Sequence, residues 1–208
     1  MLKVFFFSFH FLFIAITLQS FSAGAKTQSL VFLGDSLTEG YGVARIAAFP
    51  FLIQEKAKAN NLDWKISSSG SSGSTSASTL ARLKWIAKQK PDYVMIIMGS
   101  NDGLRGLKTE EIEKNLATAM TWAQKNKIKI ILGELLTPPN YGDDYAKKFK
   151  NLYPALAKKF SVPLGPFLLD GVAGQASLNQ SDGIHPNEKG HQIIAEKVFQ
   201  YLLPLLKK

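Results

Sequence analysis

Short runs of β-branched, aromatic and aliphatic residues alternate along this chain with longer segments in which apolar residues recur at helical spacing. The runs lie at residues 30–33, 64–67, 93–98, 128–132 and 162–169. This alternation is typical of a parallel β-sheet in which helices connect successive strands and cover both faces. We therefore predict an α/β fold of three layers, α/β/α, with a flavodoxin-like sheet of five parallel strands.

Two connecting segments show the helical spacing most clearly, because their apolar residues recur at i, i+4, i+7, i+8 and i+11. In the first segment these residues are Ile112, Leu116, Ala119, Met120 and Ala123. In the second they are Ile194, Val198, Tyr201, Leu202 and Leu205. Thr109, which two glutamates follow, is predicted to cap the N-terminus of the first of these helices.

The first 25 residues have the layout of a secretory signal peptide. Lys3 precedes an apolar run at 4–18, and a small-residue segment at 23–25 follows a polar break. We predict cleavage after Ala25, and hence a periplasmic or secreted protein. The alternative is a retained membrane anchor, although the run is shorter than the roughly 20 apolar residues that a membrane span needs.

Residues 26–208 are predicted to form a single domain, since no stretch within them separates two parts that are each large enough to fold. Segment 67–78 has the serine and glycine content of a linker, but it lies between a predicted strand and a predicted helix. We interpret it as a strand-to-helix loop. Nothing in the sequence requires an oligomer, so a monomer is expected.

Loss of Lys3 with the signal peptide lowers the formal net charge from +9 to +8. A basic exported protein can make transient contact with an anionic membrane surface, and a solvated basic surface with no partner explains the charge equally well. Nucleic acid is not expected as a partner, because neither an arginine cluster nor a known nucleic-acid-binding module accompanies the charge.

Cysteine is absent, which excludes disulfides, thiol catalysis and thiolate metal sites. The mature chain keeps two histidines, His185 and His191, so a histidine-rich metal site is not expected. Motifs of phosphate-binding loops, of metalloprotease helices and of the nucleophile elbow of larger α/β-hydrolases are also missing. We predict chemistry that needs neither a metal nor another cofactor.

Polar residues follow four of the predicted strands, at the sheet edge where open α/β folds place their sites. They occur in GDSLT at 34–38, in the glycine-containing loop at 70–73, in GSND at 99–102 and in DGIHP at 182–186. Serine becomes a nucleophile when a base takes its proton and a third group orients that base. Ser36, His185 and Asp182 are therefore candidates for these roles.

Acyl transfer also requires hydrogen-bond donors for the oxyanion that develops on the substrate carbonyl. The backbone N–H groups of Ser36 and Gly73 and the side-chain amide of Asn101 are the candidate donors. A purely structural role is the alternative for Ser36, because serine at the junction of a strand and a helix often serves only as a helix N-cap. His191 and Asp102 are expected to be structural, the second as a residue that fixes a loop.

The four segments, in this order, resemble the conserved sequence blocks of the SGNH or GDSL-type serine hydrolases. Within that superfamily the chain is similar to the periplasmic multifunctional thioesterases, lysophospholipases and arylesterases of Gram-negative bacteria. That similarity lies in GSNDGLRG at 99–106, in PNYG at 139–142 and in VPL followed by PF at 162–167. The resemblance covers nearly the whole mature chain.

The resemblance implies that Ser36 is the nucleophile, His185 the base and Asp182 its orienting acid. It also implies an oxyanion hole made by Ser36, Gly73 and Asn101, with Gly73 preferred over Gly70 by the spacing to the segment LARL at 80–83. Ser74 departs from the pattern, since aspartate is expected there, and this places the rigidity of its loop in question.

The expected activity is hydrolysis of small acyl esters and thioesters through an acyl-enzyme. Residues 103–108 and 138–142 are expected to form the lips of the substrate cleft, and ordinary turns are the alternative. Two alternatives to this function remain open at this point. The first is a carbohydrate O-deacetylase of the same superfamily, and the second is a catalytically idle lipid-binding protein of the cell envelope.

Overall fold

A computed structural model describes residues 1, 3, 27–137 and 139–206. The predicted signal peptide, residues 1–25, therefore lies almost entirely outside the described residues. In the part that is described, no helix combines the length and the apolar character that crossing a bilayer requires.

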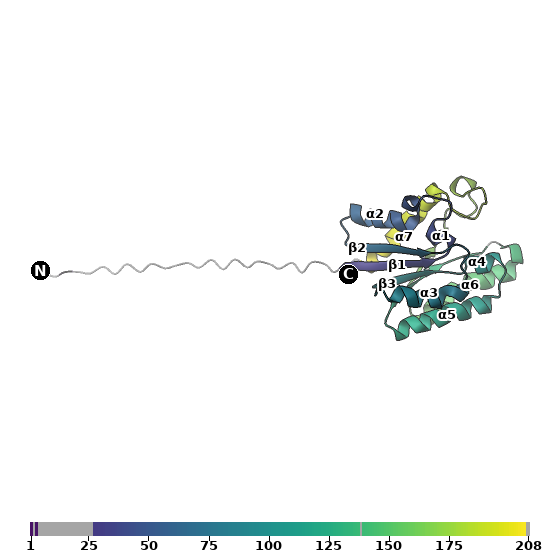
Figure 1. Ribbon diagram of the computed structural model, residues 1–208, viewed down its shortest axis with the longest axis horizontal. Coiled ribbons are helices and arrows are strands. Elements are labelled where there is room, and N and C mark those ends of the chain that lie inside the picture. Colours follow the sequence, from purple (N-terminus) through teal and green to yellow (C-terminus); the bar gives the residue numbers. More distant parts are fainter. Residues whose placement is uncertain (2, 4–26, 138, 207–208) are drawn as a thin grey trace.

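Five parallel strands form one sheet, as predicted (Figure 1). They are β1 (Gln28–Gly34), β2 (Trp64–Gly70), β3 (Tyr93–Ile97), β4 (Lys129–Glu134) and β5 (Leu164–Phe167). Their order across the sheet is β2-β1-β3-β4-β5, so the chain moves outward from β1 first in one direction and then in the other. The reversal lies beside β1, and this is where open α/β sheets place their binding crevices.

Helices cover both faces of the sheet and complete the three layers (Figure 1). On one face α2 (Phe49–Ala59) packs against α7 (Glu188–Leu206). On the other face α5 (Thr109–Lys125) packs between α3 (Thr79–Ala87) and α6 (Asp143–Phe160). The short helices α1 (Ser36–Glu39) and α4 (Ser100–Leu104) directly follow β1 and β3. Single 3₁₀ turns are η1 (Arg45–Ala47), η2 (Ser76–Ser78), η3 (Pro139–Tyr141) and η4 (Ala176–Leu178).

The apolar faces that the helical spacing predicts are buried against the sheet. All five predicted residues of α5 are at most 1% exposed. In α7, Ile194, Val198 and Leu202 are buried, while Tyr201 and Leu205 pack at the edge of the core. Burial of each of the larger of these side chains, namely Ile, Leu, Val and Met, stabilises the fold by about 1.5–3 kcal/mol. The helical spacing therefore identified the faces that hold the layers together.

The loop predicted at 67–78 is shorter than expected. Its first residues continue β2 as far as Gly70, where the ladder pairs Gly34 with Gly70, and its last residues form η2. A Cβ at Gly70 would lie 2.1 Å from the backbone N of Glu39. The small residues that mimic a linker are thus strand residues against which α1 packs closely.

The predicted cap of α5 is also wrong by one residue. Thr109 is the first residue of the helix, and the N-cap position belongs to Lys108, which makes no side-chain capping bond. The Thr109 side chain is buried instead. Such a residue packs inward and cannot project across the helix end as an N-cap side chain does.

Candidate active site

Ser36 lies on the sharp turn between β1 and α1, at the end of a central strand. Asp35 is the N-cap of α1, because its Oδ1 accepts a hydrogen bond of 3.0 Å from the backbone N–H of Leu37. Ser36 is therefore the first helical residue, and the interpretation of Ser36 as an N-cap is wrong. Its hydroxyl is not used for capping and is available to another partner.

Burial around this turn is nearly complete. Asp35 and Thr38 are fully buried, and Ser36 is 9% exposed. Burial raises the pKa of the Asp35 carboxyl, and the backbone hydrogen bond from Leu37 opposes that rise. A Cβ at Gly34 would lie 1.9 Å from the Thr38 hydroxyl oxygen, so only glycine fits between β1 and α1 there. These contacts fix the direction in which Ser36 points.

Asp182 and His185 lie together on the loop between η4 and α7. His185 Nδ1 is 2.7 Å from Asp182 Oδ2, and His185 Nε2 is 2.9 Å from Ser36 Oγ. Asp182 Oδ1 also accepts the backbone N–H groups of Ile184 and His185, each at 3.0 Å. The structure thus brings the three predicted residues into one hydrogen-bonded chain.

The protonation state of Asp182 decides which atoms donate and which accept in these hydrogen bonds. The side-chain hydrogen bond with His185, assisted by the backbone N–H groups, lowers the pKa of Asp182 to about 2. An ionised carboxylate can only accept hydrogen bonds, so Nδ1 of His185 carries a hydrogen. In the neutral ring Nε2 is then an acceptor, which faces the Ser36 hydroxyl. This is the arrangement in which imidazole can take a proton from serine.

The three candidate oxyanion donors come from three different strand ends. Asn101 lies in α4 after β3, and its Nδ2 donates to the carbonyl oxygen of Ser74 at 3.0 Å. Gly73, in the loop after β2, has a φ of +75°, which favours glycine. Within the described residues, neither the N–H of Ser36 nor that of Gly73 donates to a protein acceptor. Neither N–H group is therefore taken up by a protein partner in this part of the chain.

Gly73 does not contribute to the wall of the cavity beside Ser36, whereas Asn101 does. Gly70 differs from Gly73, because it pairs with Gly34 in the ladder, packs closely on α1 and donates its N–H to Ser68 Oγ at 3.3 Å. The side chain at position 74 takes no part in the bond to Asn101, because that bond uses the Ser74 carbonyl. The departure from the expected aspartate therefore leaves this hydrogen bond in place.

A cavity of about 500 Å³ opens beside Ser36, Asn101 and His185. Most of its wall is apolar, and the aliphatic and aromatic residues in it are Leu37, Leu104, Leu135, Leu136, Phe167, Leu169, Ala173 and Ile184. Three of them, Leu104, Leu136 and Ile184, are more than a third exposed to solvent. The cavity is thus an open and largely apolar pocket, and Ser36, Asn101 and His185 are among the polar residues that line it.

The two predicted lips differ in what they contribute. Leu104, from the segment 103–108, lines the cavity. In the segment 138–142, Pro138 lies outside the described residues, and none of residues 140–142 lines the cavity. The Tyr141 hydroxyl instead donates to the Leu104 carbonyl at 3.1 Å, so the second segment supports the first. Leu136 and Thr137, just before it, form that side of the wall.

His191 and Asp102 have structural surroundings, as predicted. His191 is buried, its Nδ1 accepts the backbone N–H of Phe49 at 3.3 Å, and burial lowers its pKa to about 4. Asp102 accepts both the backbone N–H and the hydroxyl of Ser76, at 2.8 and 2.6 Å. It thereby ties the turn that carries Asn101 to the loop that carries Gly73.

Sequence reasoning missed Arg82, which stabilises the same region from α3. Its guanidinium donates to the carbonyl oxygens of Gly34, at 2.8 Å, and of Ser69. Partial burial lowers the pKa of Arg82, against the opposing effect of Asp35. Arginine in a helix after a glycine loop carries no distinctive sequence signal, and only the structure reveals this support for the ends of β1 and β2.

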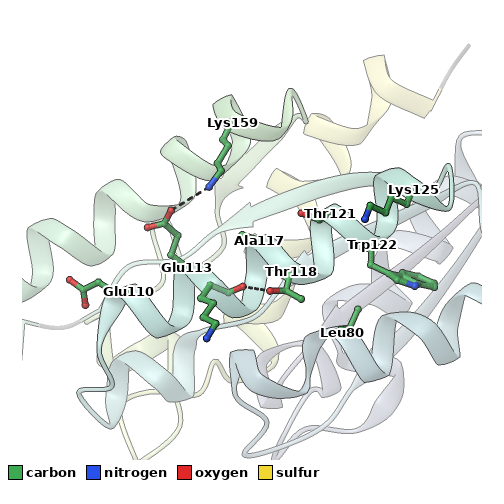
Figure 2. Close-up of a pocket in the computed structure, with 10 residues that line it drawn as sticks. Leu80, Glu110, Glu113, Ala117, Thr118, Thr121, Trp122, Lys125 and Lys159 are labelled. Carbon is green, nitrogen blue, oxygen red and sulfur yellow. Dashed lines mark hydrogen bonds and ion pairs between the residues drawn. The ribbon is translucent and has the colours of Figure 1, made fainter.

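A second hollow, of about 670 Å³, lies elsewhere, along α5 between α3 and α6 (Figure 2). Lys159 and Glu113 face each other across it at 4.0 Å, and the Thr118 hydroxyl donates to the Lys114 carbonyl within α5 (Figure 2). None of the candidate site residues lines it. Among the described residues, no three His, Asp or Glu side chains are grouped so that they can hold a metal ion.

Known proteins resemble this chain over most of its length. The GDSL-like lipase/acylhydrolase family matches residues 32–193, which include Ser36, Asn101, Asp182 and His185. The chain belongs to this family. The protein is accordingly an ester hydrolase of the GDSL or SGNH type.

Relatives of this GDSL-family chain include thioesterase 1/protease 1/lysophospholipase L1 of Escherichia coli K12, with 36% identity over 96% of this chain and 95% of the relative. Esterase TesA of Pseudomonas aeruginosa is also 36% identical, over 88% of this chain and 91% of the esterase. Among solved structures, the psychrotrophic esterase EstA from Pseudoalteromonas sp. superposes with a TM-score of 0.83. It is 30% identical and covers 87% of this chain and all of its own. These similarities confirm the three-layer fold.

Proposed function

We propose that this enzyme hydrolyses acyl esters and thioesters of lipid-like acyl groups through an acyl-enzyme on Ser36. The observation that carries the proposal is the hydrogen-bonded chain from Asp182 through His185 to Ser36, which ends at the apolar cavity. Relatives named thioesterase, lysophospholipase and arylesterase support the substrate class.

In the first half of the proposed reaction, Ser36 Oγ attacks the acyl carbonyl carbon while its proton moves to His185 Nε2. The C–O or C–S bond to the leaving group then breaks, and the imidazolium gives the proton to the departing oxygen or sulfur. Asp182 keeps the ring oriented and stabilises its positive charge. The first half ends with the acyl group esterified to Ser36.

Water completes the reaction by the same route. His185 takes a proton from water as its oxygen attacks the acyl carbon, and the Ser36 oxygen leaves with that proton. Both halves place a negative charge on the carbonyl oxygen, for which Ser36 N–H, Gly73 N–H and Asn101 Nδ2 are the proposed donors. Products are a carboxylic acid and an alcohol or thiol, and the enzyme is restored.

The wall of the cavity favours a lipid-like acyl group over the acetyl group of a sugar. Each methylene buried against it is worth about 0.8 kcal/mol, whereas a sugar ring would need several polar partners and most of this wall is apolar. The open pocket leaves the leaving group near solvent. Different alcohols and thiols are therefore expected to be accepted.

The decisive experiment is labelling with a fluorophosphonate probe together with turnover of a p-nitrophenyl ester and an acyl-thioester. Wild-type enzyme should take up one label per chain at Ser36, and Ser36→Ala should lose both labelling and turnover of both substrates. Labelling of Ser36→Ala, or turnover that survives in it, would falsify the assignment. Absence of labelling in the folded wild-type protein would instead support the idle lipid-binding alternative.

Export is part of the same proposal, and it rests on the signal-peptide pattern of residues 1–25. In a Gram-negative host the mature protein should begin at Lys26 and appear in the periplasmic fraction. N-terminal sequencing tests this directly. Recovery of Met1 on a membrane-bound product would revive the membrane-anchor alternative.

A further inference from the structure

Gln180 links the loop of Asp182 and His185 to the turn that ends α1, the short helix that begins at Ser36. Its side-chain Nε2 donates to the carbonyl oxygen of Tyr41 at 2.6 Å and to that of Pro186 at 3.1 Å. Carbonyl oxygens only accept hydrogen bonds, so the NH₂ end of the amide must face them, and both of its hydrogens are used. Tyr41 lies near the start of the folded domain in sequence, whereas Gln180 and Pro186 lie near its end.

One end of this link lies directly behind the nucleophile. The backbone N–H of Tyr41 donates to the Ser36 carbonyl at 3.1 Å, so the turn that Gln180 contacts is the one that ends α1. Gly42 follows with a φ of +76°, and a Cβ there would lie 2.1 Å from Gln180 Oε1. Glycine at position 42 thus leaves room for the amide of Gln180.

The other end of the link closes the loop that carries the base. The backbone N–H of Gln180 donates to the His185 carbonyl at 2.8 Å, and the Gly183 N–H donates to the Gln180 carbonyl at 2.9 Å. The Tyr41 ring lies against the His185 ring, with 4.7 Å between centroids and 41° between planes. The imidazole is therefore held between the Gln180 loop and the Tyr41 ring.

Asp182 cannot fulfil this role, because it belongs to the same loop as His185. The Asp182–His185 pair fixes how the ring is turned within its loop, but it does not fix how far that loop lies from Ser36. The Gln180 amide, by contrast, bonds to both sides. A displacement of about 1 Å in a catalytic group can cost on the order of 10²-fold in rate.

We propose that Gln180 is a positioning residue, whose side-chain amide sets the distance between His185 and Ser36 by bonding simultaneously to the Tyr41 turn and to Pro186. It touches no reacting atom and acts through His185. The proposal rests on the proposed catalytic roles of Ser36 and His185. It deepens that proposal by assigning a residue outside the sequence blocks of the family.

The test is Gln180→Glu, which keeps the size of the side chain and replaces both donors with an acceptor. Gln175→Glu is the matched control, because the Gln175 amide also donates to a loop carbonyl, that of Gly171 at 2.9 Å, which belongs to neither side of the Gln180 link. For each variant one measures kcat and KM with a p-nitrophenyl ester, the second-order rate of fluorophosphonate labelling, and Tm. Assays are run well below the Tm of each variant.

In Gln180→Glu, kcat and the labelling rate should fall together by roughly tenfold to 10²-fold. KM should stay within about twofold, because the cavity wall is untouched, and Gln175→Glu should match wild type. Gln180→Met, which removes the donors without adding charge, should reproduce the loss and substitutes for Gln180→Glu if that variant does not fold.

Unchanged kcat in both Gln180 variants, or a loss confined to KM, or an equal loss in Gln175→Glu, would overturn the positioning role. The Ser36→Ala experiment separates this failure from failure of the proposed function. If Ser36→Ala is inactive while Gln180→Glu and Gln180→Met are fully active, only the role of Gln180 is wrong. If Ser36→Ala is active, the proposed function itself is wrong.

Discussion

The side-chain Nδ2 of Asn101 lies 3.0 Å from the carbonyl oxygen of Ser74, in a loop 27 positions earlier in the chain. This bond uses one of the two amide hydrogens and fixes the plane of the carboxamide. The second hydrogen is left for the cavity that Asn101 lines. The loop after β2 thus holds in place a candidate donor that belongs to the turn after β3.

Asn101→Ala should therefore lower kcat by about 10²-fold to 10³-fold, the usual loss for one oxyanion donor. KM should change little, since the charge that the donor stabilises develops only in the transition state. Steady-state kinetics with a short-chain p-nitrophenyl ester measures both. A loss that falls on KM alone would mean that Asn101 binds the substrate and does not stabilise the oxyanion.

His185→Ala should nearly abolish turnover, while His191→Gln, in which the buried acceptor is kept, should retain it. In wild type, kcat/KM should fall in acid because an imidazolium cannot take the serine proton. Asp182 does not cause this fall, because its pKa of about 2 keeps it ionised throughout the working range. A pH profile of kcat/KM tests the claim. Full activity of His185→Ala would contradict it.

Folding stability should also depend on pH, through His191. Burial lowers its pKa from 6.5 to about 4, so the unfolded chain binds a proton more readily than the folded chain. The stabilisation is complete above pH 6.5 and is lost as pH falls toward 4. By linkage, about 2 kcal/mol of the free energy of unfolding should disappear between pH 7 and pH 5.

Urea unfolding of wild type and His191→Gln at pH 7 and pH 5 measures this contribution. The variant lacks the titrating ring, so its free energy of unfolding should fall by about 2 kcal/mol less than that of wild type over the same interval. Equal losses in the two proteins would show that His191 titrates normally in the folded state.

Acyl-chain length should control kcat/KM until the cavity is filled. Each buried methylene contributes about 0.8 kcal/mol, so each added methylene should raise kcat/KM by roughly fourfold at most. Phe167→Ala enlarges the cavity, so the rise of kcat/KM should continue to longer acyl chains than in wild type. A series of p-nitrophenyl esters from acetyl to palmitoyl measures both profiles. A flat profile with activity on acetylated sugars would favour the O-deacetylase alternative.

Periodicity and strand-end motifs predicted much of this molecule, because they depend on local rules. The burial pattern of α5 follows from a 3.6-residue repeat, and the site edge follows from the parallel sheet. The extent of β2 was not predictable, since Ser68 to Gly70 read as linker until α1 is seen to pack on them. The roles of Gln180 and Arg82 were not predictable, because their partners are backbone carbonyls that are distant in sequence.

The distance of 149 positions between Ser36 and His185 has a consequence for biosynthesis. During translation the nucleophile emerges from the ribosome long before the base, and the sheet can gain four strands while no general base is present. On the proposed mechanism, a nascent or truncated polypeptide that ends before DGIHP carries Ser36 without its base. On that mechanism, hydrolytic capacity therefore arises only when the last loop closes on the first turn and brings His185 to within 2.9 Å of Ser36.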